Sequence, residues 1–120
     1  MPNNLIIFGC GGVGSWLADF CVRNESFETI SLVDFDFVEE KNLVRQNYTR
    51  NDETKSKVFA LMQRLNSIND TTILTYNRKI MDELDLTFDK ETIAVIATDN
   101  VVSKRLIGKY FNRWGFTSPS

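Results

Sequence analysis

A short apolar run that passes directly into a glycine-rich turn constrains the fold of this chain more than any other feature. A buried strand is predicted at residues 5–8, Leu-Ile-Ile-Phe, and a turn at residues 9–14, Gly-Cys-Gly-Gly-Val-Gly, leads into an amphipathic helix. Glycines permit a tight turn and let backbone N–H groups approach a phosphate closely. The N-terminus of the helix adds partial positive charge, so the unit predicts an anion-binding site.

A second apolar run ends in an acidic residue. Residues 29–33 predict a strand, and Asp34 follows it, about twenty positions after the last glycine of the turn. An acid at this spacing reaches the ribose of a nucleotide. Two plainer interpretations remain: a tight turn in a domain that binds nothing, and a loop acid without a ligand. The glycines and Asp34 together favour nucleotide binding.

Apolar residues recur at helical spacing after the turn and in two later segments. The first helix is predicted from about residue 13 to residue 24, with one stripe facing a sheet. The second is capped by Thr54, and the third follows Asn100. The predicted stripes are Val13, Trp16, Leu17, Phe20 and Cys21; Val58, Leu61, Met62 and Leu65; and Leu106, Ile107, Tyr110, Phe111 and Trp114.

Strands and helices alternate along the chain. Further strands are predicted at residues 71–76 and 92–97, the latter apolar on both faces, as buried parallel strands are. A polar connection covers residues 35–53, and a short helix or turn is expected at residues 81–89. The alternation predicts an α/β, Rossmann-like, doubly wound and mainly parallel sheet, in which ligands bind at the carboxyl ends of the strands. Gly9, Asp34 and Asp99 follow three of these ends.

Composition limits the possible partners and chemistry. The chain of 120 residues predicts one domain over residues 1–116 with a flexible tail at 117–120. The net charge of −2 argues against a nucleic-acid partner, and no apolar run is long enough for a membrane span. The cations of the last predicted helix therefore indicate a solvated face rather than a docking patch for an acidic partner or a nucleic acid. They are Lys104, Arg105, Lys109 and Arg113.

The reactive side chains narrow the choice further. Cys10 and Cys21 are too few for a disulfide framework and fit a reducing compartment, so a cytoplasmic location is expected. Both are expected to be small buried residues rather than nucleophiles. The sequence contains no histidine, which excludes catalysis by histidine and metal sites that contain it.

The long connection and the segment after it contain groups that a triphosphate needs. Reactions at phosphorus are catalysed largely by positioning and by positive charge on the phosphate oxygens. Arg45 and Lys57 would supply that charge, and Asp99 would hold Mg²⁺. Taken singly, the two cations also fit a solvated surface, and Asp99 fits an N-cap of the last helix. Only the set favours a triphosphate.

Several motifs in this order resemble the E1-like adenylyltransferases, the family that activates ubiquitin and the bacterial sulfur carriers ThiS and MoaD. The resemblance implies an enzyme that uses ATP and Mg²⁺ to adenylate the C-terminal carboxylate of a ubiquitin-like or sulfur-carrier protein. The motifs are Gly9-x-Gly11-Gly12-Val13-Gly14-Ser15, Asp34-Phe35-Asp36-x-Val38, Asn42-Leu43-x-Arg45-Gln46, a lysine that opens the next helix, and Thr98-Asp99-Asn100.

The resemblance also implies roles for single residues. Asp34 binds the ribose of ATP, Asp99 coordinates magnesium, and Lys55 is a weaker candidate than Lys57 for the lysine role. Thr54 stands where the family usually has glycine, and Ile96 where it often has an acid. The remaining nucleotide-binding residues are Gly9, Gly11, Gly12 and Gly14 in the turn, and Asn42, Arg45 and Lys57 at the phosphates.

The family domain is about twice this length. In that family, the segments that would lie outside this chain carry an arginine that reaches a neighbouring subunit, a catalytic cysteine and a zinc site. A homodimer or a complementing subunit is therefore expected. Two alternatives remain: a non-catalytic nucleotide-binding half that works by dimerising, and an NAD(P)-binding redox module. The glycines and Asp34 permit the second alternative, whereas the Asn42–Gln46 and Thr98–Asn100 motifs count against it.

Overall fold

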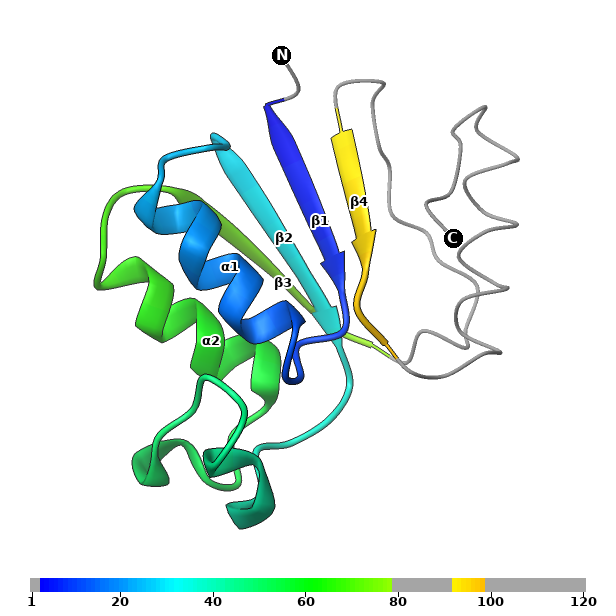
Figure 1. Ribbon diagram of the computed structural model, residues 1–120, viewed down its shortest axis with the longest axis vertical. Helices are drawn as coiled ribbons and strands as arrows, with labels where there is room; N and C mark the ends of the chain where they lie inside the picture. Colours follow the sequence, from blue (N-terminus) through cyan, green and yellow to red (C-terminus); the bar gives the residue numbers. More distant parts are fainter. Residues whose placement is uncertain (1–2, 79–91, 99–120) are drawn as a thin grey trace.

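The computed structural model describes residues 3–78 and 92–98 of the chain (Figure 1). Its strands form one parallel sheet in the order β3-β2-β1-β4. The strands are β1 (Asn4–Phe8), β2 (Thr29–Asp34), β3 (Thr72–Asn77) and β4 (Thr92–Ile96); the helices are α1 (Gly14–Arg23) and α2 (Lys57–Asn66), with short 3-10 turns η1 (Glu40–Leu43) and η2 (Arg50–Asp52) between β2 and α2.

The sheet and its helices enclose a core that spans most of the described chain. Figure 1 shows α1 and α2 side by side across one face of the sheet. β1 lies between β2 and β4, and its residues Leu5 to Phe8 are all buried, which explains its continuous apolar sequence. The predicted α/β, Rossmann-like parallel sheet is confirmed. Its strand order changes direction between β1 and β4, and ligands bind at such a switch point.

The buried face of α1 differs from the predicted stripe. Val13, Trp16 and Phe20 are 68%, 51% and 63% exposed, so the prediction was wrong for these three residues. The helix instead turns its small residues toward the sheet: Gly14, Ala18 and Val22 recur at i, i+4 and i+8 and are buried. A Cβ on Gly14 would overlap the Gly9 carbonyl oxygen. This close contact sets the rotation of α1, which apolar spacing alone does not reveal.

The start of α2 also differs from the prediction. Ser56, not Thr54, is the N-cap, and its Oγ accepts a hydrogen bond from the Phe59 amide at 3.2 Å. Thr54 adopts a left-handed backbone with φ of 72°, which does not suit a cap. The predicted stripe is otherwise correct: Val58, Leu61 and Leu65 are buried, and Met62 is half-buried.

The packing revises one further expectation and shows how the long connection is ordered. β4 was predicted to be buried on both faces, but it pairs only with β1 in the described sheet, and Ile93 is 42% exposed. The connection after β2 is ordered by η1 and η2, and it buries Val38 and Tyr48. The predictions for residues 81–89, the last helix, the boundary at 116 and the tail at 117–120 lie outside the described residues. No helix of the described part is long and apolar enough to cross a membrane.

Candidate functional site

The turn between β1 and α1 depends on the absence of side chains at two of its glycines. Gly9 has a φ of 102°, and a Cβ there would lie 2.9 Å from the carbonyl carbon and oxygen of Ala97, just after β4. Gly14 packs against Gly9 in the same way. Gly12 differs, because a Cβ there would meet no protein atom within 4 Å. Gly9 and Gly14 are therefore required by packing, whereas Gly12 borders open space.

The N-terminus of α1 faces this open space without a side-chain cap. Val13 holds the N-cap position with helical backbone angles and makes no capping hydrogen bond through its side chain. The first amides of a helix need acceptors from outside the helix, and the helix dipole favours an anion there. An anionic ligand at Gly12 and Val13 would supply both the acceptors and the charge.

Asp34 links the turn after β1 to the turn after β2. Its Oδ2 accepts a hydrogen bond from the Cys10 amide at 2.7 Å, and its Oδ1 accepts one from the Asp36 amide at 2.9 Å. A carboxylate has about four acceptor positions, so two remain for a ligand. Asp34 thus orders the loop that it borders and keeps the capacity to bind hydroxyl groups.

These elements meet at a cavity of about 330 Å³, the first cavity. It lies at the carboxyl ends of β1, β2 and β4, where the strand order changes direction. Of the predicted site residues, Gly9, Gly11, Gly12, Asp34 and Lys57 line it. The full lining is Gly9, Gly11, Gly12, Val13, Asp34, Asp36, Gln46, Lys57, Ala97 and Thr98.

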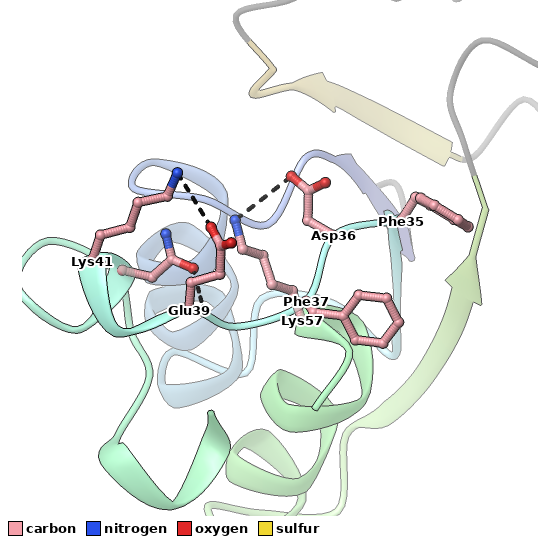
Figure 2. A pocket seen from close by; sticks show the side chains of 7 residues that line it. Phe35, Asp36, Phe37, Glu39, Lys41 and Lys57 are labelled. Carbon is pink, nitrogen blue, oxygen red and sulfur yellow. Dashed lines mark hydrogen bonds and ion pairs between the residues drawn. The ribbon is translucent and has the colours of Figure 1, made fainter. Parts of the chain in front are cut away.

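A second cavity, of about 460 Å³, shares Asp36 and Lys57 with the first (Figure 2). Its other lining residues are Phe35, Phe37, Glu39, Lys41 and Asn42. In Figure 2, Lys57 extends from the start of α2 toward Asp36, while Lys41 reaches Glu39. The Lys57 Nζ lies 3.8 Å from Asp36 Oδ2, and the Lys41 Nζ lies 3.2 Å from Glu39 Oε2. The second cavity therefore continues the first across the Asp36–Lys57 ion pair.

The predicted phosphate-contacting residues occupy different positions. Lys57 lines both cavities and Asn42 lines the second. The Asn42 Oδ1 accepts a hydrogen bond from the Glu39 amide at 2.8 Å. Arg45 is exposed and lines neither cavity, although its carbonyl accepts a hydrogen bond from Trp16 Nε1 at 2.8 Å. The structure thus brings Lys57 and Asn42 to the site but leaves the Arg45 side chain outside the two cavities.

Gln46 is a lining residue to which the sequence assigned no role. It lies next to Gly11, whose Cβ position would be 3.7 Å from Gln46 Nε2. Its Oε1 is buried and has no hydrogen-bond partner among the described residues. A buried unpaired amide oxygen is costly, so this side chain gains from a donor supplied at the cavity. The adjacency to Arg45 in the motif was the signal that could have identified it.

A buried polar network, also not predicted, ties the connection after β2 to both helices. The Asn47 amide donates to Ser15 Oγ at 3.1 Å, and its Nδ2 donates to Asp19 Oδ2 at 2.9 Å. Its Oδ1 accepts from Arg64 Nε of α2 at 2.8 Å. Burial alone would raise the pKa of Asp19, but the hydrogen bonds from Asn47 and Arg23, with the positive charges of Arg23 and Arg64, lower it. The network fixes the connection that borders the site.

The two cysteines are buried, as predicted. Cys10 accepts a 2.6 Å hydrogen bond from the buried Tyr48 hydroxyl through its carbonyl oxygen. Burial, together with the negative charge of Asp34, raises the pKa of the Cys10 thiol, and burial raises that of Cys21. Both thiols stay protonated at neutral pH, so neither is an activated nucleophile.

The predicted metal ligand Asp99 lies outside the described residues. Within residues 3–78 and 92–98, no three histidine, cysteine or acidic side chains gather into a group that could hold a metal ion. The described chain therefore provides the nucleotide-sized cavities and a cation, while the magnesium assignment to Asp99 stays a prediction.

Comparisons with known proteins agree with this geometry. The model of the ThiF family matches residues 3–114. This chain belongs to the ThiF family. The match confirms the E1-like resemblance that the glycine turn, the Asp34 segment and the Asn42–Gln46 segment indicated.

Individual relatives are longer than this chain. An adenylyltransferase and sulfurtransferase MOCS3 of Dictyostelium discoideum is 30% identical over 108 residues, which cover 88% of this chain and 25% of that protein. The E. coli tRNA N6-threonylcarbamoyladenosine dehydratase TcdA, solved in complex with ATP, is 24% identical with a TM-score of 0.79, over 96% of this chain and 49% of that one. E. coli MccB, solved with MccA, is 24% identical with a TM-score of 0.81, over 94% and 35%. The chain thus spans half the length of these proteins or less.

Proposed function

We propose that this ThiF-family chain binds ATP and uses it to adenylate a carboxylate. The observation that carries the proposal is the convergence of four features on the first cavity. They are the glycine turn, the uncapped N-terminus of α1, the Asp34 carboxylate and the buried cation of Lys57. A MOCS3 relative is named an adenylyltransferase and TcdA has been solved with ATP, which supports the same assignment.

The described residues fit the parts of ATP. The open space at Gly12 and the first turn of α1, which has no side-chain cap, suit phosphate oxygens, which are acceptors only. Asp34 retains acceptor positions for ribose hydroxyls, because two of its about four acceptor positions are used by backbone amides. Lys57 lies between the two cavities, where a chain of phosphates can extend from the first into the second.

The proposed reaction joins a carboxylate to AMP. A carboxylate oxygen attacks the α-phosphorus, the bond from that phosphorus to the bridging oxygen of pyrophosphate breaks, and an acyl-adenylate and pyrophosphate result. No general base is needed, because a carboxylate is ionised at neutral pH. Lys57 offsets charge that develops on the phosphate oxygens, and Arg45 is proposed to close onto the phosphates from outside the cavities. Mg²⁺, proposed to bind Asp99, would neutralise the leaving pyrophosphate.

The carboxylate is proposed to be the C-terminus of a ubiquitin-like or sulfur-carrier protein. The MOCS3 relative is named an adenylyltransferase and sulfurtransferase, and MccB has been solved together with MccA, which supports a second molecule beside the nucleotide. A second copy of the chain, or a complementing subunit, is proposed to complete the site. β4 supports this, because it is an edge of the described sheet, and an uncovered edge invites pairing.

Nucleotide binding is tested by calorimetry on the full chain with ATP and Mg²⁺, and separately with NAD. We expect ATP to bind and NAD to bind at least about ten-fold more weakly, a difference of about 1.4 kcal/mol. In Gly12→Ala, the added methyl group enters the cavity without touching the protein, so ATP affinity should fall while the fold is kept. A Val44→Ala variant, on an 88% exposed side chain outside both cavities, is the matched control. Preference for NAD would establish the redox alternative instead.

Adenylation is tested by exchange of labelled pyrophosphate into ATP with a candidate carrier. If Arg45 serves the transition state, Arg45→Ala slows exchange much more than it weakens ATP binding. Equal losses in exchange and binding would mean that Arg45 contributes to ground-state binding only. A chain that binds ATP but exchanges no pyrophosphate with any carrier would be the non-catalytic half.

A further inference from the structure

The Asp36–Lys57 ion pair borders both cavities, and its two side chains are buried to different extents. The Lys57 side chain is 8% exposed, whereas the Asp36 side chain is 72% exposed. A buried ammonium group needs a counter-ion, because desolvation of an unpaired charge is costly. The separation of 3.8 Å from Nζ to Oδ2 is long for a charged hydrogen bond. Asp36 is therefore a loosely held partner of a cation that cannot be left without one.

The backbone around this pair is fixed independently of the two charged groups. The Lys57 amide donates to the Asp36 carbonyl at 2.9 Å, and the Asp36 amide donates to Asp34 Oδ1 at 2.9 Å. The Lys57 ammonium can exchange one counter-ion for another by side-chain rotation alone. Such an exchange requires no movement of β2 or α2.

We infer that Asp36 is the resident counter-ion of Lys57 and a specificity determinant, which only a phosphate group of the ligand displaces. The inference rests on the proposed function, because it assigns the phosphates of the nucleotide to Lys57. A phosphate with more than one negative charge outcompetes a single carboxylate for the ammonium group, whereas chloride or a lone carboxylate does not. Asp36 thereby keeps the site closed to weak anions and lowers its affinity for phosphate by the cost of displacement.

The second cavity provides a matched comparison. Glu39 and Lys41 form an ion pair there as well, at 3.2 Å, but their side chains are 62% and 78% exposed. Neither ion of this pair is buried, so solvent screens both charges and the pair has little effect on anion binding. Both variants remove one negative charge and little else. Glu39→Gln keeps an acceptor oxygen for the capping box of η1, and Asp36→Asn keeps the backbone hydrogen bonds of residue 36.

The experiment is calorimetric titration with adenosine, AMP and ATP in the presence of EDTA, so that the phosphates carry their full charge. Wild type is compared with Asp36→Asn, Glu39→Gln and Lys57→Met. We expect Asp36→Asn to bind AMP and ATP about two- to five-fold more tightly, the range of an exposed carboxylate's ion pair, and adenosine equally well. Glu39→Gln removes a carboxylate that lines the second cavity and so measures the general effect of one negative charge less; because its ion pair with Lys41 is exposed, the gain for AMP and ATP should be smaller than in Asp36→Asn. In Lys57→Met, the preference for AMP over adenosine should be largely lost.

Several results would overturn the inference. Unchanged or weaker ATP binding by Asp36→Asn would mean that Asp36 holds Lys57 in place or contacts the ligand itself. Equal tightening in Glu39→Gln would reflect general charge rather than exchange at Lys57. If wild type binds no adenine nucleotide, the proposed function fails, and inorganic pyrophosphate then becomes the probe. Tighter pyrophosphate binding by Asp36→Asn than by Glu39→Gln would still support the exchange, and equal binding would overturn it.

Discussion

The turn from β1 to α1 and the connection from β2 to α2 border the same cavity but are held by different kinds of contact. The first depends on backbone atoms in close approach, at Gly9 against Ala97 and at Gly14 against Gly9. The second, residues 35–56, depends on side chains that reach across the fold, above all Asn47. The site is thus built from one segment held by backbone contacts that leave no room for a side chain and one segment held by side-chain hydrogen bonds.

This difference decides how substitutions act on the two regions. In the turn, the fold excludes an added methyl group at Gly9 and Gly14 but has room for one at Gly12, according to the direction in which the Cβ points. In the connection, the cost of a substitution depends on how many partners lose a hydrogen bond.

The largest effect is expected from Gly14→Ala. The new Cβ would overlap the Gly9 carbonyl oxygen and press on Ile7, so α1 must shift away from the sheet. We expect a loss of about 3 kcal/mol or more in the free energy of unfolding, measured with urea. Gly12→Ala, where the Cβ meets nothing within 4 Å, should lose less than about 1 kcal/mol. Similar losses in both variants would show that the turn is not governed by these contacts.

The next effect is expected from Asn47→Ala in the connection. Its side chain is buried and bonds to Asp19, Arg64 and the Ser15 carbonyl, so truncation leaves three groups short of a partner. We expect a loss of about 2–3 kcal/mol by urea unfolding. Asn66→Ala, on the exposed last residue of α2, is the control and should lose less than about 0.5 kcal/mol. A loss at Asn47 no larger than this would mean that the connection is held by its apolar residues.

The sequence predicted the turn from β1 to α1 better than the connection from β2 to α2. The glycine turn, the strand before it and Asp34 were all found, because left-handed backbone and close packing demand particular residue types. The bonds of Asn47 to Ser15, Asp19 and Arg64 join residues 32, 28 and 17 positions apart. No periodicity or composition records such pairs, so the network was missed.

Side-chain direction was the other quantity that the sequence did not supply. The spacing of Val13, Trp16 and Phe20 indicated one apolar face on α1 but not that this face points away from the sheet. Likewise, the motif placed Arg45 and Lys57 in the same predicted role, whereas only Lys57 lines the cavities. The motif fixes where a residue occurs along the chain, and the packing of its element decides where its side chain points.

Acid is expected to weaken the link between the two regions. Asp19 joins α1 to Asn47, and its pKa in the folded chain is below its ordinary value. The unfolded chain therefore takes up the proton first, so this carboxylate stabilises the fold above about pH 4 and the contribution is lost as the pH falls through the folded pKa. The free energy of unfolding, measured with urea, should fall less between neutral and acidic pH in Asp19→Asn than in wild type. The exposed Asp70→Asn variant controls for the loss of one carboxylate.

The smallest effect, opposite in sign, is expected at Thr54. This residue lies in the connection but resembles the turn in its constraint, because its φ of 72° belongs to the left-handed region that favours glycine. A β-branched side chain is strained there, and the E1-like resemblance places a glycine at the same position. Thr54→Gly should therefore raise the free energy of unfolding by about 0.5 kcal/mol, since relief of strain exceeds the added entropy of the unfolded chain.

The matched change is Thr71→Gly at the half-buried residue before β3, which has no positive φ and whose Oγ1 donates to Asn69. Thr71→Gly should lower the free energy of unfolding, because glycine gains more backbone entropy on unfolding and the hydrogen bond from Oγ1 to Asn69 is lost. A gain at Thr54 with a loss at Thr71 would show that the connection contains one position limited by its backbone conformation, as the glycines of the turn are. If Thr54→Gly instead lowers the free energy of unfolding, the side-chain contacts of Thr54 outweigh its backbone strain. This part of the connection would then be held by side-chain contacts, as the part around Asn47 is.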